Sequence, residues 1–543
     1  MPFPSTSILF GESTLNARRN YHPVDEDNQD DETHVSSPPT GLYGYIFGFL
    51  YEEDLEEPDD ILYRSTVQNS THIWNPLNAA LFLSLVLSTA ATAVPVTLVA
   101  AMSNDLLDSV QQDGGPYIAF APRAAAAAVL GTSVGKFING PVGDIYGARR
   151  TSVLYNVLLA VALVGLALCR TVTQASWACW AVEFCYSVQW PCCIVTLATH
   201  YRGSSSGMYE GGIYVTSLAA RLGSLLGIPL CSLLLRQTHW RFVAVLGAWV
   251  SLVASSVTYL FVSDSVEMTD DPQNPIDPVQ LKKWFPESFQ QQQRSSRPVS
   301  LRSMWGIVYF VFRTNLVPSL RHVLKSGTFW IVALAHTGSS MVRTSERILS
   351  SYLSDTSLGT LSENRAAGLA VFLSLGTVLG LVVAGNLFAS KQERQRKWLV
   401  SRLYMVTICA CYLLALLAIP SFRKFLNAPS LVTTFQVMAA CTAGFGIAVQ
   451  FYHIPSLVGA TFGTDKGMYS AYTDGVAYGL ASLVWRIVGS AVSHGNADGG
   501  GWAYGWAAVA LLLILSAILM VEFMEHYFCR SRLGGSYETI IFA

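Results

Sequence analysis

Long apolar segments separated by short polar ones run through most of the chain. A helix that crosses the hydrocarbon layer of a membrane needs about 20 largely apolar residues, and twelve segments satisfy this requirement. The predicted segments are 75–102, 117–140, 152–169, 174–199, 208–235, 241–263, 327–353, 366–389, 398–420, 429–459, 467–492 and 502–526. The pattern therefore predicts an all-α membrane protein with twelve transmembrane helices.

One long polar interruption divides the twelve segments into six and six. Residues 264–326 are rich in proline and glutamine, which is a linker composition. The N-terminal residues are acidic and contain few large apolar side chains, so we expect them to be largely disordered. The predicted regions are an acidic tail (1–73), an N-terminal six-helix bundle (74–263), a linker (264–326), a C-terminal six-helix bundle (327–527) and a C-terminal tail (528–543).

The composition narrows the class of protein. Only 13% of the residues are charged and the net charge is −2, so the chain has no basic face for nucleic acid. The segments contain no nucleotide-binding loop, no nucleophile–base set and no metal-ligand spacing. We therefore expect no enzyme activity, no cofactor, no metal and no nucleic-acid partner, and we expect a monomer in the lipid bilayer.

Lysine and arginine are unevenly distributed between the two sets of loops. If the N-terminus is cytoplasmic, the inner loops and the linker hold most of these residues, and the outer loops hold few. Cytoplasmic loops of membrane proteins carry the excess of positive charge. The sequence thus predicts a multi-pass protein with both termini in the cytoplasm.

The two halves of the chain contain similar short motifs. Val188–Trp190 in the fourth segment is similar to Val449–Phe451 in the tenth, at an offset of 261. Gly207–Tyr209 at the start of the fifth segment recurs as Gly467–Tyr469 at the start of the eleventh, at an offset of 260. Parallel duplication of a six-helix unit places a substrate site near the bilayer midplane, between the two halves.

The run Gly140–Arg150 follows the second segment and contains Asp144, Arg149 and Arg150. It resembles the signature loop of the major facilitator superfamily. The resemblance implies the major facilitator fold and a conformational gate in which these three charged residues make ion-pair contacts. The corresponding run after the eighth segment, Gly385–Ala389, has alanine where the acid would be.

Within that superfamily the chain is most similar to the organophosphate:phosphate antiporters. The similarity rests on Gly135–Gly140, Gln189–Cys192, Met341–Arg343 and Gly500–Trp502. It implies that Lys136 and Arg343 contribute to an anion site.

Two positions depart from that family's pattern. The family has a second arginine near the end of the first helix, but Ala90–Val96 contains no cation here. The family's fifth-helix histidine falls close to Arg221. The resemblance therefore implies an anion site that has been rebuilt.

Charged residues inside apolar segments are the main site candidates, because a charge at the bilayer centre costs at least about 2.5–3.5 kcal/mol. Arg221 lies 13 residues into its segment, which corresponds to about 20 Å and therefore to mid-depth. Arg343 is nearly as deep, and Arg486 is a possible symmetry mate of Arg221. A guanidinium group binds phosphate or carboxylate through two parallel hydrogen bonds.

The remaining candidates are acids, aromatic residues and histidines. The acids Glu183, Asp474 and Glu346 are either ion-pair partners of the arginines or groups that couple transport to protons. The aromatic candidates for a cavity wall are Tyr186, Trp190, Tyr214, Tyr472 and Tyr478. We expect His336 and His453 to be ordinary interior histidines, although either could titrate.

These observations predict a secondary active transporter of a small organic anion, such as a phosphorylated metabolite or phosphate, with phosphate or protons as the counter- or co-ion. One alternative is a proton-coupled symporter of an uncharged or zwitterionic solute, in which the arginines are locked in ion pairs with Glu183 and Asp474, within about 4 Å. Another is a membrane sensor that binds a nutrient without transporting it. Deletion of residues 1–40 would separate the sensor from a transporter, which should retain flux.

Overall fold

The computed structural model describes nine stretches of the chain. These are residues 75–106, 120–201, 206–262, 317–357, 361–390, 393–426, 428–461, 466–494 and 500–531. The predicted tail 1–73 lies outside the described residues, as do most of the predicted linker and most of the C-terminal tail.

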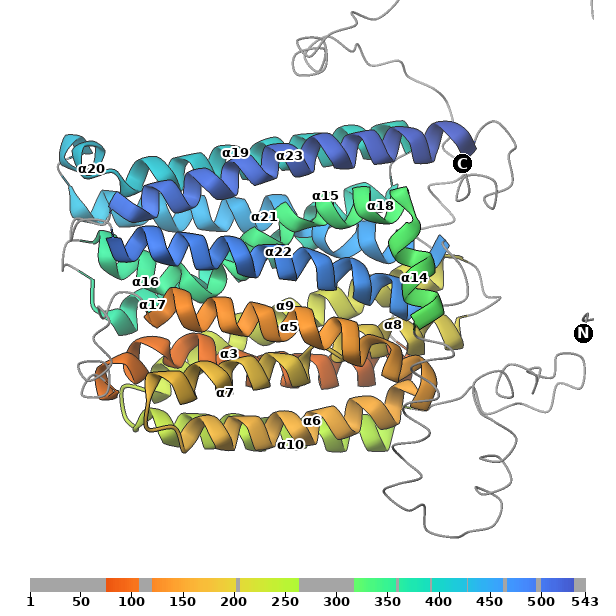
Figure 1. The fold of residues 1–543 in the computed structure, drawn as a ribbon, viewed down its shortest axis with the longest axis horizontal. Coiled ribbons are helices and arrows are strands. Elements are labelled where there is room, and N and C mark those ends of the chain that lie inside the picture. Colours follow the sequence, from red (N-terminus) through yellow and green to blue (C-terminus); the bar gives the residue numbers. More distant parts are fainter. Residues whose placement is uncertain are drawn as a thin grey trace, which may run out of the picture. The chain divides into compact units, whose positions relative to one another are not determined.

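Every regular element of the described residues is helical (Figure 1). The N-terminal half contains α3 (Pro76–Asp105), α5 (Phe120–Tyr146), α6 (Ala148–Ala167), α7 (Val172–Tyr186), α8 (Gln189–His200), α9 (Ser206–Leu234) and α10 (Trp240–Phe261). The C-terminal half contains α14 (Val317–Lys325), α15 (Gly327–Thr344), α16 (Glu346–Thr356), α17 (Glu363–Gly380), the π-helix η5 (Leu381–Gly385), α18 (Asn386–Ser390), α19 (Glu393–Ala418), α20 (Pro420–Leu426), α21 (Pro429–Thr461), α22 (Lys466–His494) and α23 (Gly500–Ser531).

Each of the twelve predicted segments coincides with one helix or with consecutive helices, which confirms the all-α membrane fold. Within the described stretches, 10 helical spans are long and apolar enough to cross a membrane. The other two predicted segments are also helical, as α5 and as the pair α15–α16. These two contain Lys136, Arg343, Glu346 and Arg347, which contribute to their lower mean hydropathy.

Polar side chains fix where several of the helices begin. The side-chain oxygen of Asn75 accepts a hydrogen bond from the backbone N–H of Asn78 at 2.8 Å, and Pro76 follows as the first helical residue of α3. Thr171 caps α7 and Ser326 caps α15 in the same way. Such caps satisfy backbone donors that the first helical turn leaves without partners.

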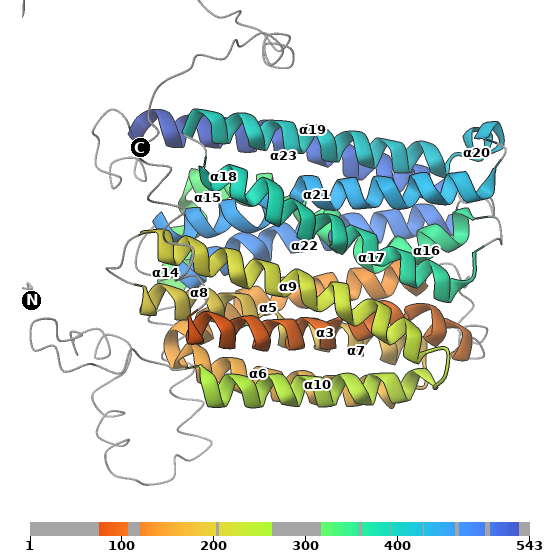
Figure 2. The ribbon, with the colours of Figure 1, turned by 180° about the vertical axis from the view of Figure 1, so that it is seen from behind.

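The helices run between two ends of the bundle, which we call the α14 end and the α20 end after the short helices found there (Figures 1 and 2). Helices α3 to α10 form one group and α15 to α23 the other. The groups meet mainly where α5 packs against α22 and where α9 packs against α17. Each group has its own apolar core, and the core of the C-terminal group extends to Ala125 and Val129 of α5.

Glycine contacts show the duplication of the two halves directly. A Cβ atom on Gly131 would lie 2.3 Å from the carbonyl oxygen of Trp180, and one on Gly376 would lie 1.8 Å from that of Cys441. One turn further along, a Cβ atom on Gly135 would lie against the carbonyl oxygen of Phe184, and one on Gly380 against that of Phe445.

The contacted residues are separated by the same offset of 261 that relates the repeated motifs, since 180 and 184 become 441 and 445. The glycines are related by a constant offset of 245. Both halves therefore pack their second helix against their fourth through the same pair of small residues.

The structure corrects the prediction of a loop after the second segment. Helix α5 continues through Pro141 to Tyr146, and only Gly147 separates it from α6. Gly147 has φ of 91°, a conformation open to glycine and strained for other residues. The chain therefore reverses through one residue, and most of the signature run is helical.

Candidate functional site

Two of the membrane helices are interrupted close to mid-depth. The fourth predicted segment breaks between α7 and α8 at Ser187, and the seventh breaks between α15 and α16 at Ser345. Both breaks are local irregularities, because the N–H groups of Ser187 and Ser345 still donate to the carbonyl oxygens of Glu183 and Met341. The predicted site residues Tyr186, Trp190, Arg343 and Glu346 all lie within three residues of these two breaks.

Three of the predicted residues meet in one ion cluster. The Arg221 Nη1 atom of α9 lies 3.5 Å from Glu346 Oε2, and Arg343 Nη1 donates a hydrogen bond to the same carboxylate oxygen. Ser374 Oγ of α17 donates to Glu346 Oε1 at 2.6 Å. Arg221 is only 3% exposed, and the side chain of Glu346 is equally buried. We call Arg221, Arg343 and Glu346 the central cluster.

The local sequence favours this geometry. Arg343 is in the last turn of α15, and Glu346 is the first residue of α16. A cation near a helix C-terminus and an anion near an N-terminus both interact favourably with the helix dipoles. The spacing of three residues also brings the two side chains together.

The central cluster carries an excess of positive charge. Two guanidinium groups, which stay charged in proteins, face a single carboxylate. The Arg221 Cζ atom also lies 5.6 Å from the centre of the Tyr452 ring, which can attract a cation through its π face. The Nε atom of Arg221 is buried and has no hydrogen-bond partner among the described residues.

Aromatic side chains form a row beside this cluster. The ring of Tyr452 lies 5.8 Å from Trp190 of α8 and 4.8 Å from Phe451, whose ring stacks on His336 at 5.0 Å. Part of η5 packs on the same row, since Leu381 and Tyr452 share one apolar cluster. The row joins the two halves, and sequence reasoning identified Trp190 but not Tyr452.

The other aromatic candidates lie in several environments. Tyr186 makes a hydrogen bond of 2.8 Å to Thr89 of α3. Tyr478 packs against the C-terminal core, the Tyr472 ring stacks on Phe137 at 5.6 Å, and Tyr214 is half-buried.

A second cluster lies nearer the α14 end. Lys136 Nζ of α5 is 2.8 Å from Asp474 Oδ2 of α22, and His336 Nε2 of α15 is 3.2 Å from Asp474 Oδ1. We call these three residues the lysine–histidine cluster. His336 is fully buried, as expected of an interior histidine, and its Nε2 atom lies near a carboxylate that sequence reasoning had not paired with it.

A third cluster lies nearer the α20 end. Arg347 Nη2 of α16 is 2.6 Å from Glu183 Oε1 of α7, and Thr132 Oγ1 of α5 donates to Glu183 Oε2 at 3.1 Å. Sequence reasoning missed Arg347. The available signal was three charged residues within five positions, 343 to 347, in an otherwise apolar segment.

The three clusters occupy different depths along the bundle. Asp474 is eight residues from the start of α22, which places it about 12 Å from the α14 end. Arg221 is 15 residues from the start of α9 and 13 from its end, about 20 Å from either. Arg347 is nine residues from the end of α16, about 13 Å from the α20 end. Each cluster pairs a residue of one half with a residue of the other.

The predicted gate residues and Arg486 lie elsewhere. Arg149 donates to the carbonyl oxygen of Tyr259 at 2.5 Å, and its Cζ atom lies 5.0 Å from the centre of the same ring. Arg150 and Arg486 are exposed, and Arg486 is not part of the central cluster. The backbone of Asp144 belongs to α5, while its side chain lies outside the described residues.

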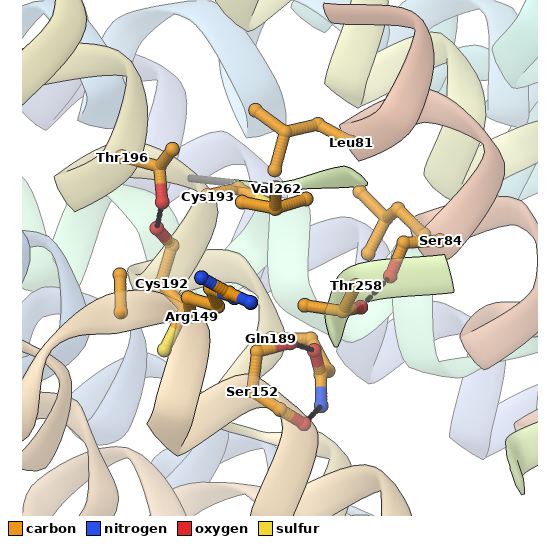
Figure 3. A pocket seen from close by; sticks show the side chains of 12 residues that line it. Leu81, Ser84, Arg149, Ser152, Gln189, Cys192, Cys193, Thr196, Thr258 and Val262 are labelled. Atoms are coloured by element: carbon orange, nitrogen blue, oxygen red, sulfur yellow. Dashed lines mark hydrogen bonds between the residues drawn. The ribbon is translucent and has the colours of Figure 1, made fainter. Parts of the chain in front are cut away.

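Arg149 also lines a small cavity in the N-terminal half, between α3, α6, α8 and α10 (Figure 3). Polar pairs in its wall are already bonded to each other, Ser84 to Thr258 and Ser152 to Gln189, each at 2.5 Å. None of the residues of the three ion clusters lines this cavity. It is therefore a feature of the packing beside the site.

Ion pairs of largely buried side chains thus connect the two groups of helices. The sequence profile of the Major Facilitator Superfamily matches residues 80–493. This is most of the chain, so the protein belongs to the Major Facilitator Superfamily. It is accordingly a multi-pass integral membrane transporter of small-molecule solutes and not an enzyme.

Solved transporter structures share the fold at low sequence identity. The proton:xylose symporter XylE bound to 6-bromo-6-deoxy-D-glucose is 14% identical, with a TM-score of 0.57 over 84% of this chain and 96% of that one. XylE from E. coli in a partially occluded inward open conformation is 13% identical, with a TM-score of 0.53 over 82% and 98%. The nucleoside transporter NupG is 15% identical, with a TM-score of 0.50 over 83% and 99%. No curated protein matches the chain by sequence.

Proposed function

We propose that the protein is a secondary active transporter of a small organic anion, and that Arg221 and Arg343 bind the anionic group. The observation that carries the proposal is the composition of the central cluster. Two guanidinium groups from opposite halves, that of Arg221 buried and that of Arg343 half-buried, converge on one carboxylate oxygen. One positive charge is thus left uncompensated within the cluster, at a depth where isolated charge is costly.

An anionic substrate would complete this cluster. A carboxylate or phosphate can accept two parallel hydrogen bonds from a guanidinium group, and Arg221 Nε is a buried donor without a described partner. Glu346 holds the two arginines in position before the anion arrives. Because Arg221 belongs to one half and Arg343 to the other, an anion that binds both draws the halves together, as alternating access requires.

The phosphorylated or phosphate substrates suggested by the family resemblance belong to this proposal. The excess of one positive charge favours a monoanionic group. A phosphate monoester carries about −1.5 to −2 at neutral pH and would need a further cation or a change in the contacts of Glu346. A competition panel must therefore contain carboxylates as well as phosphate esters.

A second function is favoured by one observation. Glu346, and not the predicted Glu183 or Asp474, contacts both arginines within 4 Å; arginines held in ion pairs are expected of a proton-coupled symporter for an uncharged or zwitterionic solute. In that reading the arginines are structural, and the aromatic row of Trp190 and Tyr452 would stack on the solute.

Reconstituted transport separates the two functions. The full chain is placed in proteoliposomes preloaded with phosphate, and uptake of labelled phosphate is measured with unlabelled phosphate esters, carboxylates, sugars and amino acids as competitors. Arg343→Ala should reduce anion exchange at least about 30-fold, because loss of a buried hydrogen-bonded charge costs 2–5 kcal/mol. Arg343→Lys should restore part of the activity, since it keeps the charge and loses the planar donor pair.

Arg236→Ala is the matched control, because Arg236 is exposed and lies outside the three clusters. It should leave exchange unchanged. Competition by sugars or amino acids alone, with transport retained in Arg343→Ala, would instead establish the second function.

A further inference from the structure

Two arginines outside the three ion clusters lie where α5 packs against α22, a contact that we call the α5–α22 seam (Figure 1). Arg123 belongs to α5 in the N-terminal half, and Arg486 belongs to α22 in the C-terminal half. Both side chains are exposed, and within the described part of the chain neither forms an ion pair or a hydrogen bond.

The two arginines lie at the same level of the seam. Ser482 Oγ of α22 donates a hydrogen bond to the carbonyl oxygen of Ala126 at 2.9 Å, and a Cβ atom on Gly489 would lie 2.7 Å from the Cβ atom of Pro122. The helices are therefore antiparallel here, and each arginine lies between these two contacts on its own helix. The contacts on either side hold the two arginine backbones at one depth.

The side of the seam that carries the arginines is apolar. Leu483 and Ile487 are 56% and 60% exposed on α22, and Leu130, two turns from Arg123 on α5, is 45% exposed. Large exposed apolar side chains that gather on one face mark a surface that contacts a membrane or a partner. Because both helices span the membrane, this face of the seam contacts lipid.

The depth of the pair matches the edge of the hydrocarbon layer. Arg486 is eight residues from the end of α22, which corresponds to about 12 Å along the helix axis. A charge that faces hydrocarbon is costly without a partner. An arginine side chain can run along apolar surface and bring its guanidinium group to the lipid headgroups.

The described acids toward the α20 end are already engaged. Asp105, Glu183 and Asp355 each contact another side chain. The counter-charge for the two arginines therefore comes from outside the described helices. A phosphate group suits this position, because each planar guanidinium group can donate two parallel hydrogen bonds to its oxygens.

We propose that Arg123 and Arg486 together bind the phosphate of one anionic phospholipid headgroup, in the leaflet at the α20 end. The apolar surroundings favour a lipid over a dissolved anion, because the acyl chains of the same molecule cover the exposed side chains of Leu130 and Leu483. Lipid binding here does not depend on the transported solute, and it is therefore separate from the proposed function.

A headgroup that contacts both arginines connects the two halves of the protein. One arginine belongs to each half, so separation of α5 from α22 at this end moves the two guanidinium groups apart and weakens their hold on the phosphate. A ligand favours the conformation that it binds more tightly. The bound lipid thus stabilises the arrangement in which the halves meet at the α20 end.

Native mass spectrometry of the full chain in a nonionic detergent measures this binding. Phosphatidylglycerol is titrated, and diacylglycerol with the same acyl chains is the matched lipid without a phosphate. The wild type should retain phosphatidylglycerol in preference to diacylglycerol. One basic residue contributes about fivefold to the binding of anionic lipid, so Arg123→Gln and Arg486→Gln should each weaken retention about fivefold, and the double variant about 25-fold.

Two further variants serve as controls. Arg236→Gln removes an exposed arginine that follows α9 and lies outside the seam, so it should bind phosphatidylglycerol like the wild type. Arg123→Lys keeps the charge and loses the planar donor pair, so it should lose less affinity than Arg123→Gln. Equal retention by the wild type and the double variant, or an equal loss in Arg236→Gln, would overturn the proposal.

Thermal unfolding in detergent distinguishes a lipid site from a site for a dissolved anion. Phosphatidylglycerol should raise the unfolding midpoint of the wild type more than that of the double variant Arg123→Gln/Arg486→Gln, while inorganic phosphate should shift both proteins alike. A shift by inorganic phosphate that the double variant lacks would overturn the assignment to a lipid. Neither measurement uses a transported solute, so a failure of the proposed anion transport would leave both results unchanged.

Discussion

The two halves of the molecule repeat the same packing but interrupt different helices. The first helix is continuous in the N-terminal half, as α3, and broken in the C-terminal half, as α15 and α16. The second is continuous as α5, while its equivalent contains the π-helix η5. The fourth is broken into α7 and α8, while its equivalent α21 runs unbroken for 33 residues.

The charged residues of the ion clusters do not follow the repeat. The offset of 261 places Gly444 opposite Glu183, and a Cβ on Gly444 would lie 2.1 Å from the Leu373 carbonyl oxygen. The offset of 245 places Leu381 opposite Lys136. Glycine contacts thus keep both halves in one architecture, and the ion clusters are built from positions where the halves differ.

We expect the largest loss of stability from a substitution beside the break between α15 and α16, in the C-terminal half. Glu346→Ala leaves the buried Arg221 and the half-buried Arg343 without the carboxylate that both contact. Removal of one partner of a buried ion pair destabilises a protein by about 3–5 kcal/mol. We therefore expect a marked fall in the thermal unfolding midpoint in detergent, partly reversed by a high concentration of a carboxylate or phosphate salt.

Glu525→Ala provides the matched control. Its partner Lys397 is 30% exposed, and exposed ion pairs contribute about 0–1 kcal/mol. An unfolding midpoint for Glu346→Ala equal to that of Glu525→Ala would show that Glu346 does not neutralise the arginines.

The glycine contacts should respond alike in the two halves. Gly376→Ala and Gly131→Ala each place a methyl group against a backbone carbonyl, at 1.8 Å and 2.3 Å before relaxation. Overpacking of this kind costs about 1–3 kcal/mol, and the shorter contact should make Gly376→Ala the more destabilising of the two. Chemical unfolding of both variants in detergent measures the difference.

Gly165→Ala is the control, and we expect it to raise the free energy of unfolding where the buried glycine variants lower it. Its Cβ would meet nothing within 4 Å, and alanine in a helix interior is favoured over glycine by about 0.5–1 kcal/mol. A large loss of stability in only one of the two buried glycine variants would argue that the halves do not share this packing.

Most of the fold follows from the sequence because apolar length is a strong signal. Each predicted segment is helical, since a chain in hydrocarbon must satisfy its backbone groups within the helix. The breaks were not predicted, because apolar residues continue through Ser187 and because the backbone there stays near the helical region, with φ of −54° and ψ of −25°. Only Gly147 separates α5 from α6, and the amino-acid composition of the run did not indicate so short a connection.

The site was predictable only in part. Arg221 and Arg343 could be proposed as site candidates from the sequence, because each is a charged residue deep within an otherwise largely apolar segment. Which partner each one meets depends on contacts between distant segments, such as the 138 residues that separate His336 from Asp474. No local rule relates them, so the proximity of His336 to Asp474 was not predicted.

We expect the smallest change in stability from substitutions of Gln189 and Gln450, the two equivalent glutamines of the repeated motif. Gln189 accepts a hydrogen bond from Ser152 Oγ at 2.5 Å and donates to the Ser152 carbonyl oxygen at 3.3 Å. Gln450, its equivalent, is fully buried, and neither of its side-chain polar atoms has a hydrogen-bond partner among the described residues. Removal of a satisfied buried partner costs about 1–3 kcal/mol, whereas removal of an unsatisfied polar group relieves a desolvation penalty.

Gln189→Leu should therefore lower the unfolding free energy by about 1–3 kcal/mol, and Gln450→Leu should leave it unchanged or raise it. The double variant Gln189→Leu/Ser152→Ala should recover part of the loss, because it also removes the hydroxyl left without a partner. A destabilised Gln450→Leu would show that Gln450 has a polar partner, and the halves would then be alike at this position. Measured stability of these variants thus tests whether the repeat extends from packing to hydrogen bonding.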